Sequence, residues 1–125
     1  MRRGARRPVR VKSVTQCAEP GDGMRVLVER RWPRGACRQR ATIDLWLREA
    51  APSLALSTWY RRDPRRWERF RERYRAELSR RARVVHLLED LRRRTAVTLV
   101  FGAQDDTRNH AQVLREIIDR KGVLP

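Results

Sequence analysis

A chain of 125 residues with 31 basic and 15 acidic side chains has the length of one ordinary domain and a net charge of +16. Its apolar residues recur at regular spacings, which argues against general disorder, and no apolar run is long enough for a signal-peptide core or a membrane span. We therefore expect a basic flexible tail at residues 1–7 and a single cytoplasmic domain at residues 8–125.

The excess of positive charge makes attraction to nucleic acid and other polyanions physically expected. The preference for arginine over lysine says less, because a G+C-rich genome favours arginine codons. The two cysteines, Cys17 and Cys37, form neither a C-x-x-C pair nor a metal-ligand spacing with His86 and His110. The sequence therefore predicts free thiols and no metal, and because it has no Gly-rich phosphate loop we expect no cofactor.

Two strands are predicted near the start of the domain, at residues 9–14 and 24–30, with a Gly- and Pro-containing loop between them. Residues 26–28 are apolar at consecutive positions, which is typical of a strand covered on both faces.

Four helices are predicted in the middle of the chain, and the first two are short. One would be capped by Thr42, ended by Pro52 and apolar at Ile43, Trp46, Leu47 and Ala50. Another would be capped by Ser53 and present Leu56, Trp59 and Tyr60, after which Asp63 and Pro64 begin a third.

The third helix has the clearest pattern, because Trp67, Phe70, Tyr74 and Leu78 fall in one narrow stripe that should pack inward. A fourth helix carries Val84, Leu87, Leu88 and Leu91. Residues 95–101 then read as a β-branched strand, and Val113, Leu114, Ile117 and Ile118 mark a last helix after a cap at Asp106 or Thr107 and before an end at Gly122. Strands separated by long helical stretches indicate an α/β fold, a single domain with a small, mostly parallel sheet packed by helices.

The third helix also carries arginines at four-residue spacing, Arg65, Arg69 and Arg73. A face this positive could lie along phosphates. However, Trp67, Phe70 and Tyr74 are on the opposite stripe, and nucleic-acid platforms need aromatic rings beside the charge. A solvated helix face is therefore the first interpretation, and a nucleic-acid surface is the alternative.

Two loops follow predicted strands, and in open α/β sheets the functional crevice lies beyond the carboxyl ends of the strands. In "RRWPRG", Pro33 pushes Trp32 towards an extended conformation, and Pro33, Arg34 and Gly35 suit a type I turn. In "FGAQDDTRNHAQVL", Asn109 and His110 occupy the first turn of the last helix, with His110 on the stripe that faces the sheet.

These loops allow two interpretations. If the strands adjoin, His110 could act as an acid or base near Arg34, in a pocket for an anion or a polarised carbonyl. Alternatively, His110 is a buried histidine bonded to a backbone carbonyl, Asn109 is a helix-start residue, and Arg34 is a surface partner of Asp105 or Asp106.

Four ordered strings, "RVLVERRWPRG", "IDLWLREAAPS", "WYRRDPRRWERFRERYRAEL" and "VTLVFGAQDDTRNHAQVL", resemble the YeaO-like family of small bacterial proteins, a family of unknown function. The resemblance runs from about Val9 to Ile118. It implies one α/β domain with a small, largely parallel sheet and assigns no activity. The positions that match the family pattern are Arg30, Trp32, Pro33, Arg34, Gly35, Trp46, Ala51, Pro52, Ser53, Trp67, Phe70, Tyr74, Asn109, His110 and Ala111.

The chain departs from that pattern at Glu29, where the family has Asp, and at Gln104, where a basic residue is usual. A role for the carboxylate at position 29 would have to tolerate one extra methylene. The pattern does not call for a cysteine at Cys37, which argues against a thiol nucleophile there.

The leading hypothesis is a site for a small anionic or nucleotide-like ligand at the strand ends, and it leaves open whether the protein is an enzyme. In it His110 is the catalytic residue, and the ligand is bound by Arg30, Trp32, Arg34, Gly35 and Asn109. The alternative is a nucleic-acid-binding module that uses the basic tail and Arg65, Arg69 and Arg73. No membrane partner is expected, and the pattern does not indicate an oligomeric state.

Overall fold

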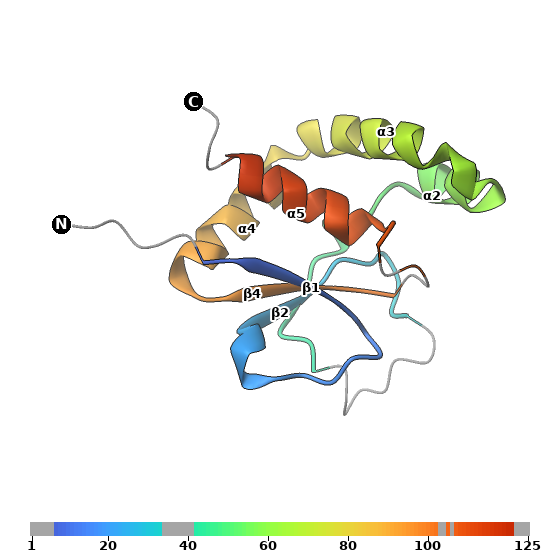
Figure 1. Ribbon diagram of the computed structural model, residues 1–125. Helices are drawn as coiled ribbons and strands as arrows, with labels where there is room; N and C mark the ends of the chain where they lie inside the picture. Colours follow the sequence, from blue (N-terminus) through green and yellow to red (C-terminus); the bar gives the residue numbers. More distant parts are fainter. Residues whose placement is uncertain (1–6, 34–41, 103–104, 106, 122–125) are drawn as a thin grey trace.

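The computed structural model describes residues 7–33, 42–102, 105 and 107–121. They form a four-stranded sheet that carries its α-helices on one side (Figure 1). The strands are β1 (Val9–Ser13), β2 (Met24–Leu27), β3 (Leu45–Trp46) and β4 (Val97–Phe101). The α-helices are α2 (Leu54–Arg62), α3 (Trp67–Ser79), α4 (Ala82–Arg94) and α5 (His110–Lys121), and short 3-10 helices span Pro20–Asp22, Arg48–Ala50 and Pro64–Arg66.

The sheet has the order β1-β4-β2-β3, and every neighbouring pair is parallel. The predicted α/β class is therefore confirmed. Strand β4 is the last strand in the sequence, yet it lies between β1 and β2 in the sheet. All five of its residues are buried. Because the strands are parallel, β2 and β4 end at the same edge, which brings together the two loops that follow them.

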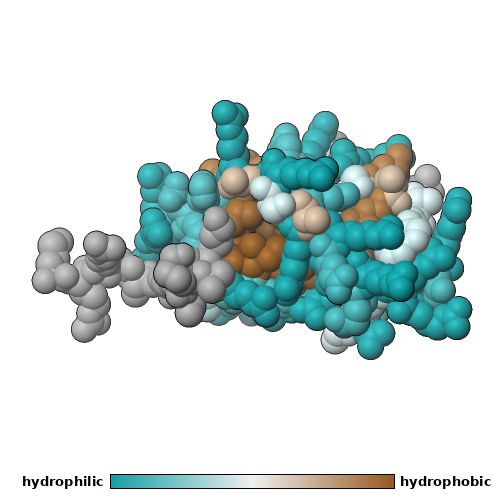
Figure 2. Space-filling model, turned by 90° about the horizontal axis from the view of Figure 1, so that it is seen from above, coloured by the Kyte–Doolittle hydropathy of each residue, from teal (hydrophilic) through white to brown (hydrophobic). Residues whose placement is uncertain are grey.

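The helix-covered face of the sheet contains the main core. Val26 and Leu99 are fully buried there, together with the inward stripe of α3, whose members Phe70, Tyr74 and Leu78 are also buried. The spacing of three and four residues places these side chains on one side of the helix, as the sequence predicts. From the helix side, hydrophilic residues cover most of the surface and hydrophobic residues show only in patches between them (Figure 2).

The opposite face of the sheet combines a small apolar cluster with a cluster of charges. The second apolar cluster comprises Val14, Leu27 and Val100, with Trp32, Ile43 and Trp46 packed against it. Coverage on both faces explains the consecutive apolar residues 26–28 in and after β2, all of them 0% exposed.

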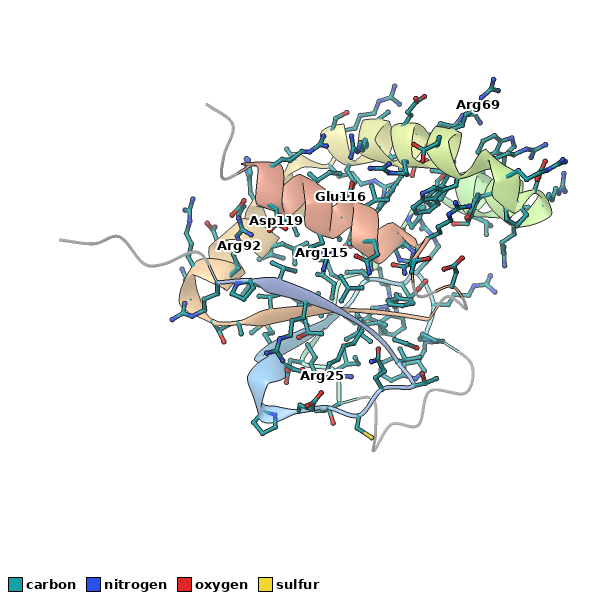
Figure 3. All side chains as sticks on the ribbon, in the orientation of Figure 1. Arg25, Arg69, Arg92, Arg115, Glu116 and Asp119 are labelled. Atoms are coloured by element: carbon teal, nitrogen blue, oxygen red, sulfur yellow. The ribbon has the colours of Figure 1, made fainter. Side chains whose placement is uncertain are left out.

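The charged part of this face, which we call the Asp22 cluster, comprises Asp22, Lys12, Arg10 and Arg25. The Asp22 carboxylate is fully buried, 2.6 Å from Arg25 Nη1 and 2.8 Å from Lys12 Nζ. Arg10 reaches the same carboxylate at 3.5 Å from the exposed side. Arg25 lies below the sheet, away from the helices (Figure 3).

The prediction of a helix between Thr42 and Pro52 is wrong, because this segment forms β3 and a short 3-10 helix. Thr42 has a positive φ and caps nothing. The segment instead pairs with β2, since the Asp44 amide bonds to the Arg25 carbonyl and the Leu47 amide bonds to the Leu27 carbonyl. Consequently Trp46 joins the second apolar cluster while Leu47 and Ala50 join the main core.

The helix starts around α3 agree with the sequence. The Ser53 hydroxyl accepts a hydrogen bond from the Leu56 amide at 3.1 Å and caps α2. The Asp63 carboxylate accepts one from the Arg65 amide, and Pro64 is the first residue of the 3-10 helix that leads into α3. The turn at Asp63 therefore folds α2 back against α3.

The predicted tail falls almost entirely at residues 1–6, outside the described residues, as does the predicted helix end at Gly122. Arg7 is described, and its guanidinium donates a hydrogen bond to the Arg93 carbonyl at 2.7 Å.

Candidate functional site

The two loops that follow β2 and β4 meet at the carboxyl edge of the sheet. The amide of Gly102 donates to Glu29 Oε2 at 2.8 Å, which links the two loops directly. A Cβ atom on Gly102 would lie only 2.6 Å from Pro33 Cβ, so this position requires glycine for close contact. Arg34 and Gly35, two of the predicted ligand-binding residues, lie outside the described residues.

His110 begins α5 and points its ring into this corner. Its Nε2 lies 2.7 Å from the Val28 carbonyl oxygen and 3.6 Å from Glu29 Oε2, and the residue is 7% exposed. The edge of the ring packs against Tyr74. The bond to a backbone carbonyl is the contact that the structural alternative predicts, while an acid or base role stays a prediction.

Asn109 is the residue that caps α5, rather than a member of its first turn. Its Oδ1 accepts from the Gln112 amide at 3.1 Å, and its Nδ2 donates to the Asp105 carbonyl at 2.9 Å. The residue is 3% exposed, so both ends of the amide are used within the fold. The predicted cap at Thr107 is therefore wrong, because α5 begins at His110, and the other predicted cap, Asp106, lies outside the described residues.

Tyr74 supports the same corner from α3. Its hydroxyl donates to the Ala50 carbonyl, and complete burial raises the pKa of Tyr74 above its ordinary value, so the phenol stays protonated. The corner around His110 is thus tied to the chain before α2 by a neutral hydrogen bond.

The side chains of Trp32 and Arg30 contact different parts of the fold. Trp32 packs edge-on against Trp46, whose Nε1 donates to the Glu29 carbonyl at 2.7 Å. Arg30 donates to the Pro52 carbonyl at 3.3 Å and lines a separate hollow with residues of the turn between α3 and α4. Neither Asn109 nor His110 lines that hollow.

The three arginines of the alternative hypothesis do come together. Arg65, Arg69 and Arg73 line one hollow of about 600 Å³ along the start of α3. Asp63 neutralises Arg65 through contacts at 3.0 and 3.2 Å, and these hydrogen bonds lower the pKa of Asp63. In the described part of the chain, Arg69 and Arg73 have no carboxylate within ion-pair distance.

Trp59 of α2 lines the same hollow, and the sequence did not identify it as a site residue. The guanidinium carbons of Arg73 and Arg66 lie 4.2 and 4.8 Å from the centre of the indole ring. Trp59 is half-buried and packs on the main core with its inner part. The signal that could have found it is the Asp63-Pro64 turn, which folds α2 against α3 and so brings Trp59 beside the arginines.

Other classes of site find little support in the described part of the chain. Its His, Cys, Asp and Glu side chains form no group of three or more that could hold a metal ion. None of its helices has both the length and the apolar character needed to cross a bilayer.

The fold and its strand-end loops define a small single-domain α/β protein with an all-parallel sheet. Residues 8–122 match the family model described as "Inactive DUF488-N3 subclade". The chain is 37% identical over 111 residues to an uncharacterised protein of Mycobacterium tuberculosis, covering 89% of this chain and 93% of that one. It is 35% identical over 108 residues to the uncharacterised protein YeaO of Escherichia coli, covering 86% and 94%. The chain therefore belongs to the YeaO-like family, and no solved structure matches it significantly.

Proposed function

We propose that the protein binds single-stranded nucleic acid through the hollow formed by α2 and the start of α3. The observation that carries this proposal is the position of Trp59 beside Arg69 and Arg73 in one hollow. Proteins that bind single strands combine a positive groove, which follows the phosphates, with an aromatic ring on which a base stacks. The hollow has both elements, and they come from neighbouring helices.

The charge around this hollow favours an anionic partner. Its four arginines are opposed by two carboxylates, and each carboxylate already has a partner: Asp63 holds Arg65, and Glu68 lies 3.3 Å from Arg71. Arg69 and Arg73 are exposed and lie one turn apart on α3. Arg69 projects from α3 away from the sheet (Figure 3). These two guanidinium groups can reach phosphates without breaking an ion pair of the fold.

Arg73 connects the two parts of the proposed interaction. In the free protein its guanidinium covers the Trp59 ring at 4.2 Å. A base that stacks on this ring displaces the guanidinium, which then becomes available for the adjacent phosphate. The cation–π contact therefore keeps the ring covered until the partner arrives.

A catalytic function is less well supported by the contacts at the strand ends. Asn109 uses both ends of its amide in capping, and His110 Nε2 is bonded to the Val28 carbonyl. The word "inactive" in the description of the matching family agrees with binding rather than turnover. Catalysis at His110 on a small anionic ligand is therefore the second candidate, favoured only by the 3.6 Å approach of the ring to Glu29.

The test is fluorescence anisotropy of a labelled single-stranded oligonucleotide, measured over a range of salt concentrations. We expect wild-type affinity to fall steeply with salt, by a factor set by the number of phosphates contacted. Replacing Arg69 and Arg73 together with glutamine should reduce the slope of log affinity against log salt by about 1.4, which corresponds to two phosphates of a single strand.

The matched control is the double replacement of Arg93 and Arg94 with glutamine. Both residues are exposed at the far end of α4, so this change removes the same charge elsewhere. Equal losses in the two double variants would mean that only net charge matters. The proposal also expects Trp59→Leu to weaken binding by about 1–3 kcal/mol while the variant stays folded by circular dichroism. Unchanged affinity in folded Trp59→Leu, or a flat salt profile for wild type, would contradict it.

A further inference from the structure

A second hollow of about 600 Å³ lies at the turn between α3 and α4, and its lining is strongly basic. Arg30, Arg80, Arg81 and Arg83 line it, against the single carboxylate of Glu49. We propose that this hollow binds a phosphoryl group. The site is separate from the Trp59 hollow, because the two lie at opposite ends of α3, and a helix of 13 residues is about 20 Å long.

Three arginines of this hollow lie close together in the sequence, and the fourth comes from a distant segment. Arg30 follows β2, Arg80 and Arg81 connect α3 to α4, and Arg83 stands in the first turn of α4. The fold therefore brings Arg30 to the short basic run at residues 80–83. A planar guanidinium presents paired N–H groups that match phosphate oxygens, so several of them around one hollow suit a phosphoryl group.

Arg81 forms the fixed wall of the hollow. Its Nη1 donates to the Glu49 carbonyl at 3.0 Å and to the Ala51 carbonyl at 2.8 Å, and its Nη2 lies 4.0 Å from Glu77. These contacts tie the α3–α4 turn to the chain that follows β3. They also leave Arg81 little capacity to bind a ligand, so the ligand contacts must come from the other arginines.

Arg30, Arg80 and Arg83 supply that capacity. All three are exposed, and none has a carboxylate partner within the described ranges of the chain. Arg30 donates to the Pro52 carbonyl, which uses one of its five N–H groups. Three positive charges thus line the hollow together with the one carboxylate of Glu49, and none of the three is within ion-pair distance of a carboxylate of the described residues.

The start of α4 adds backbone donors to these side chains. Arg81 is the N-cap but provides no side-chain cap, so the first amides of α4 lack a partner from that side chain. At the end of α3, the carbonyls of Glu77 and Leu78 accept hydrogen bonds from the amides of Arg80 and Arg81. The positive end of the helix dipole therefore favours an anion at the same place as the arginines.

A phosphoryl group can come from two sources, a free phosphate compound or the 5′-phosphate at the end of a nucleic-acid strand. The first arm of the test is a titration with inorganic phosphate at constant ionic strength, followed by calorimetry. We expect saturable binding by wild type, and at least tenfold weaker binding when Arg80 and Arg83 are both replaced by glutamine.

Two controls separate the site from general attraction to a basic protein. Replacing Arg93 and Arg94 together with glutamine removes the same charge outside both hollows and should leave phosphate affinity unchanged. Arg83→Lys keeps the charge but loses the fork of paired donors, so it should weaken binding severalfold. Absence of saturable binding by wild type, or equal losses in the two double variants, would overturn the proposal.

The second arm compares two oligonucleotides of one sequence that carry a 5′-phosphate or a 5′-hydroxyl group. If the ligand is a strand end, the phosphorylated form should bind at least tenfold tighter to wild type, and replacing Arg80 and Arg83 should abolish that preference. If inorganic phosphate binds but wild type shows no such preference, the ligand is a free phosphate compound. The Trp59 hollow is tested separately by its salt slope, so either proposal can fail without the other.

Discussion

The sheet face below the strands and the outer face of α3 both carry arginines, but they use them differently. On the sheet face, Arg25 is 2% exposed and its Nη1 lies 2.6 Å from the fully buried carboxylate of Asp22. On the outer face of α3, Arg69 and Arg73 are exposed, and no carboxylate of the described residues lies within ion-pair distance of them. The same side chain serves the fold in one place and remains available to a partner in the other.

This difference follows from how few acids the chain has. With 31 basic and 15 acidic residues, most basic side chains cannot have a carboxylate of their own. An unpaired charge lowers the stability of the fold far more when it is buried than when it is exposed. A buried arginine or lysine therefore requires a carboxylate partner more than an exposed one does. Asp22 is shared by three basic residues, and Glu116 of α5 is shared by Arg71 and Arg75 of α3. The surplus positive charge is consequently left at the surface.

The largest effect should come from Asp22→Ala. This change leaves Arg25 and Lys12 buried without their shared carboxylate, and breaking a buried pair in this way costs about 3–5 kcal/mol. We expect the free energy of unfolding in urea to fall by that amount. A loss below about 1 kcal/mol, in the range of exposed ion pairs, would mean that the Asp22 cluster is no different from the surface.

Lowering the pH should reduce the difference in the free energy of unfolding between wild type and Asp22→Ala. Burial raises the pKa of Asp22, but hydrogen bonds from Lys12, the Glu19 amide and Arg25 outweigh it and hold the pKa below the ordinary value of 3.8. A carboxyl whose pKa is depressed in the folded state contributes stability above 3.8 and loses it as the pH falls through the folded pKa. Urea unfolding should therefore show the two proteins converging below pH 3.8, and a constant gap there would contradict this assignment.

Tyr74→Phe should have the next largest effect. The change removes the hydroxyl that bonds to the buried carbonyl of Ala50, and a buried acceptor left without a partner costs about 1–3 kcal/mol. Tyr60→Phe is the matched control, because the Tyr60 hydroxyl has no hydrogen-bond partner in the described ranges. Thermal unfolding should separate the two variants clearly, and equal losses would show that the hydroxyl bond contributes nothing.

The helices could be predicted from the sequence because their signal is local. The stripe of Phe70, Tyr74 and Leu78 repeats every turn, and the caps at Ser53 and Asp63 are encoded within a few residues of each helix. Such patterns require no knowledge of distant partners.

Strand β3 could not be predicted in this way. It is two residues long and exists because the chain around it bonds to Arg25 and Leu27 of β2. The same apolar residues fit a helical spacing, so the local pattern favours the wrong structure until the partner strand is known. Long-range pairing decided the outcome.

The candidate sites likewise have one part that depends on local sequence patterns and another that depends on long-range contacts. The alignment of Arg65, Arg69 and Arg73 is local and was predicted, and so was the inward orientation of His110. The contribution of Trp59 depends on how α2 folds against α3. The convergence of Arg30 with Arg80 and Arg83 depends on the tertiary fold, so neither hollow could be derived from spacing alone.

Glu116→Gln should lower the free energy of unfolding by less than Asp22→Ala and by more than Arg69→Gln. Glu116 Oε2 lies 2.7 Å from Arg71 and 2.9 Å from Arg75, and these half-buried contacts join α5 to α3. Glutamine keeps the shape but removes the charge that both arginines share, so the free energy of unfolding should fall by about 0.5–1 kcal/mol. Adding salt should shrink this difference, whereas a difference that salt leaves unchanged would exclude an electrostatic origin.

Arg69→Gln should have the smallest effect on stability. The guanidinium is exposed and bonds to no described residue, so the free energy of unfolding should change by less than about 0.5 kcal/mol. Urea unfolding of this variant beside Asp22→Ala tests the comparison most directly, because each change removes one charged group from a basic chain. A loss above about 1 kcal/mol would place Arg69 among the charges that hold the fold together. An unchanged stability, combined with weaker oligonucleotide binding, would show that this arginine is retained for a partner and not for the fold.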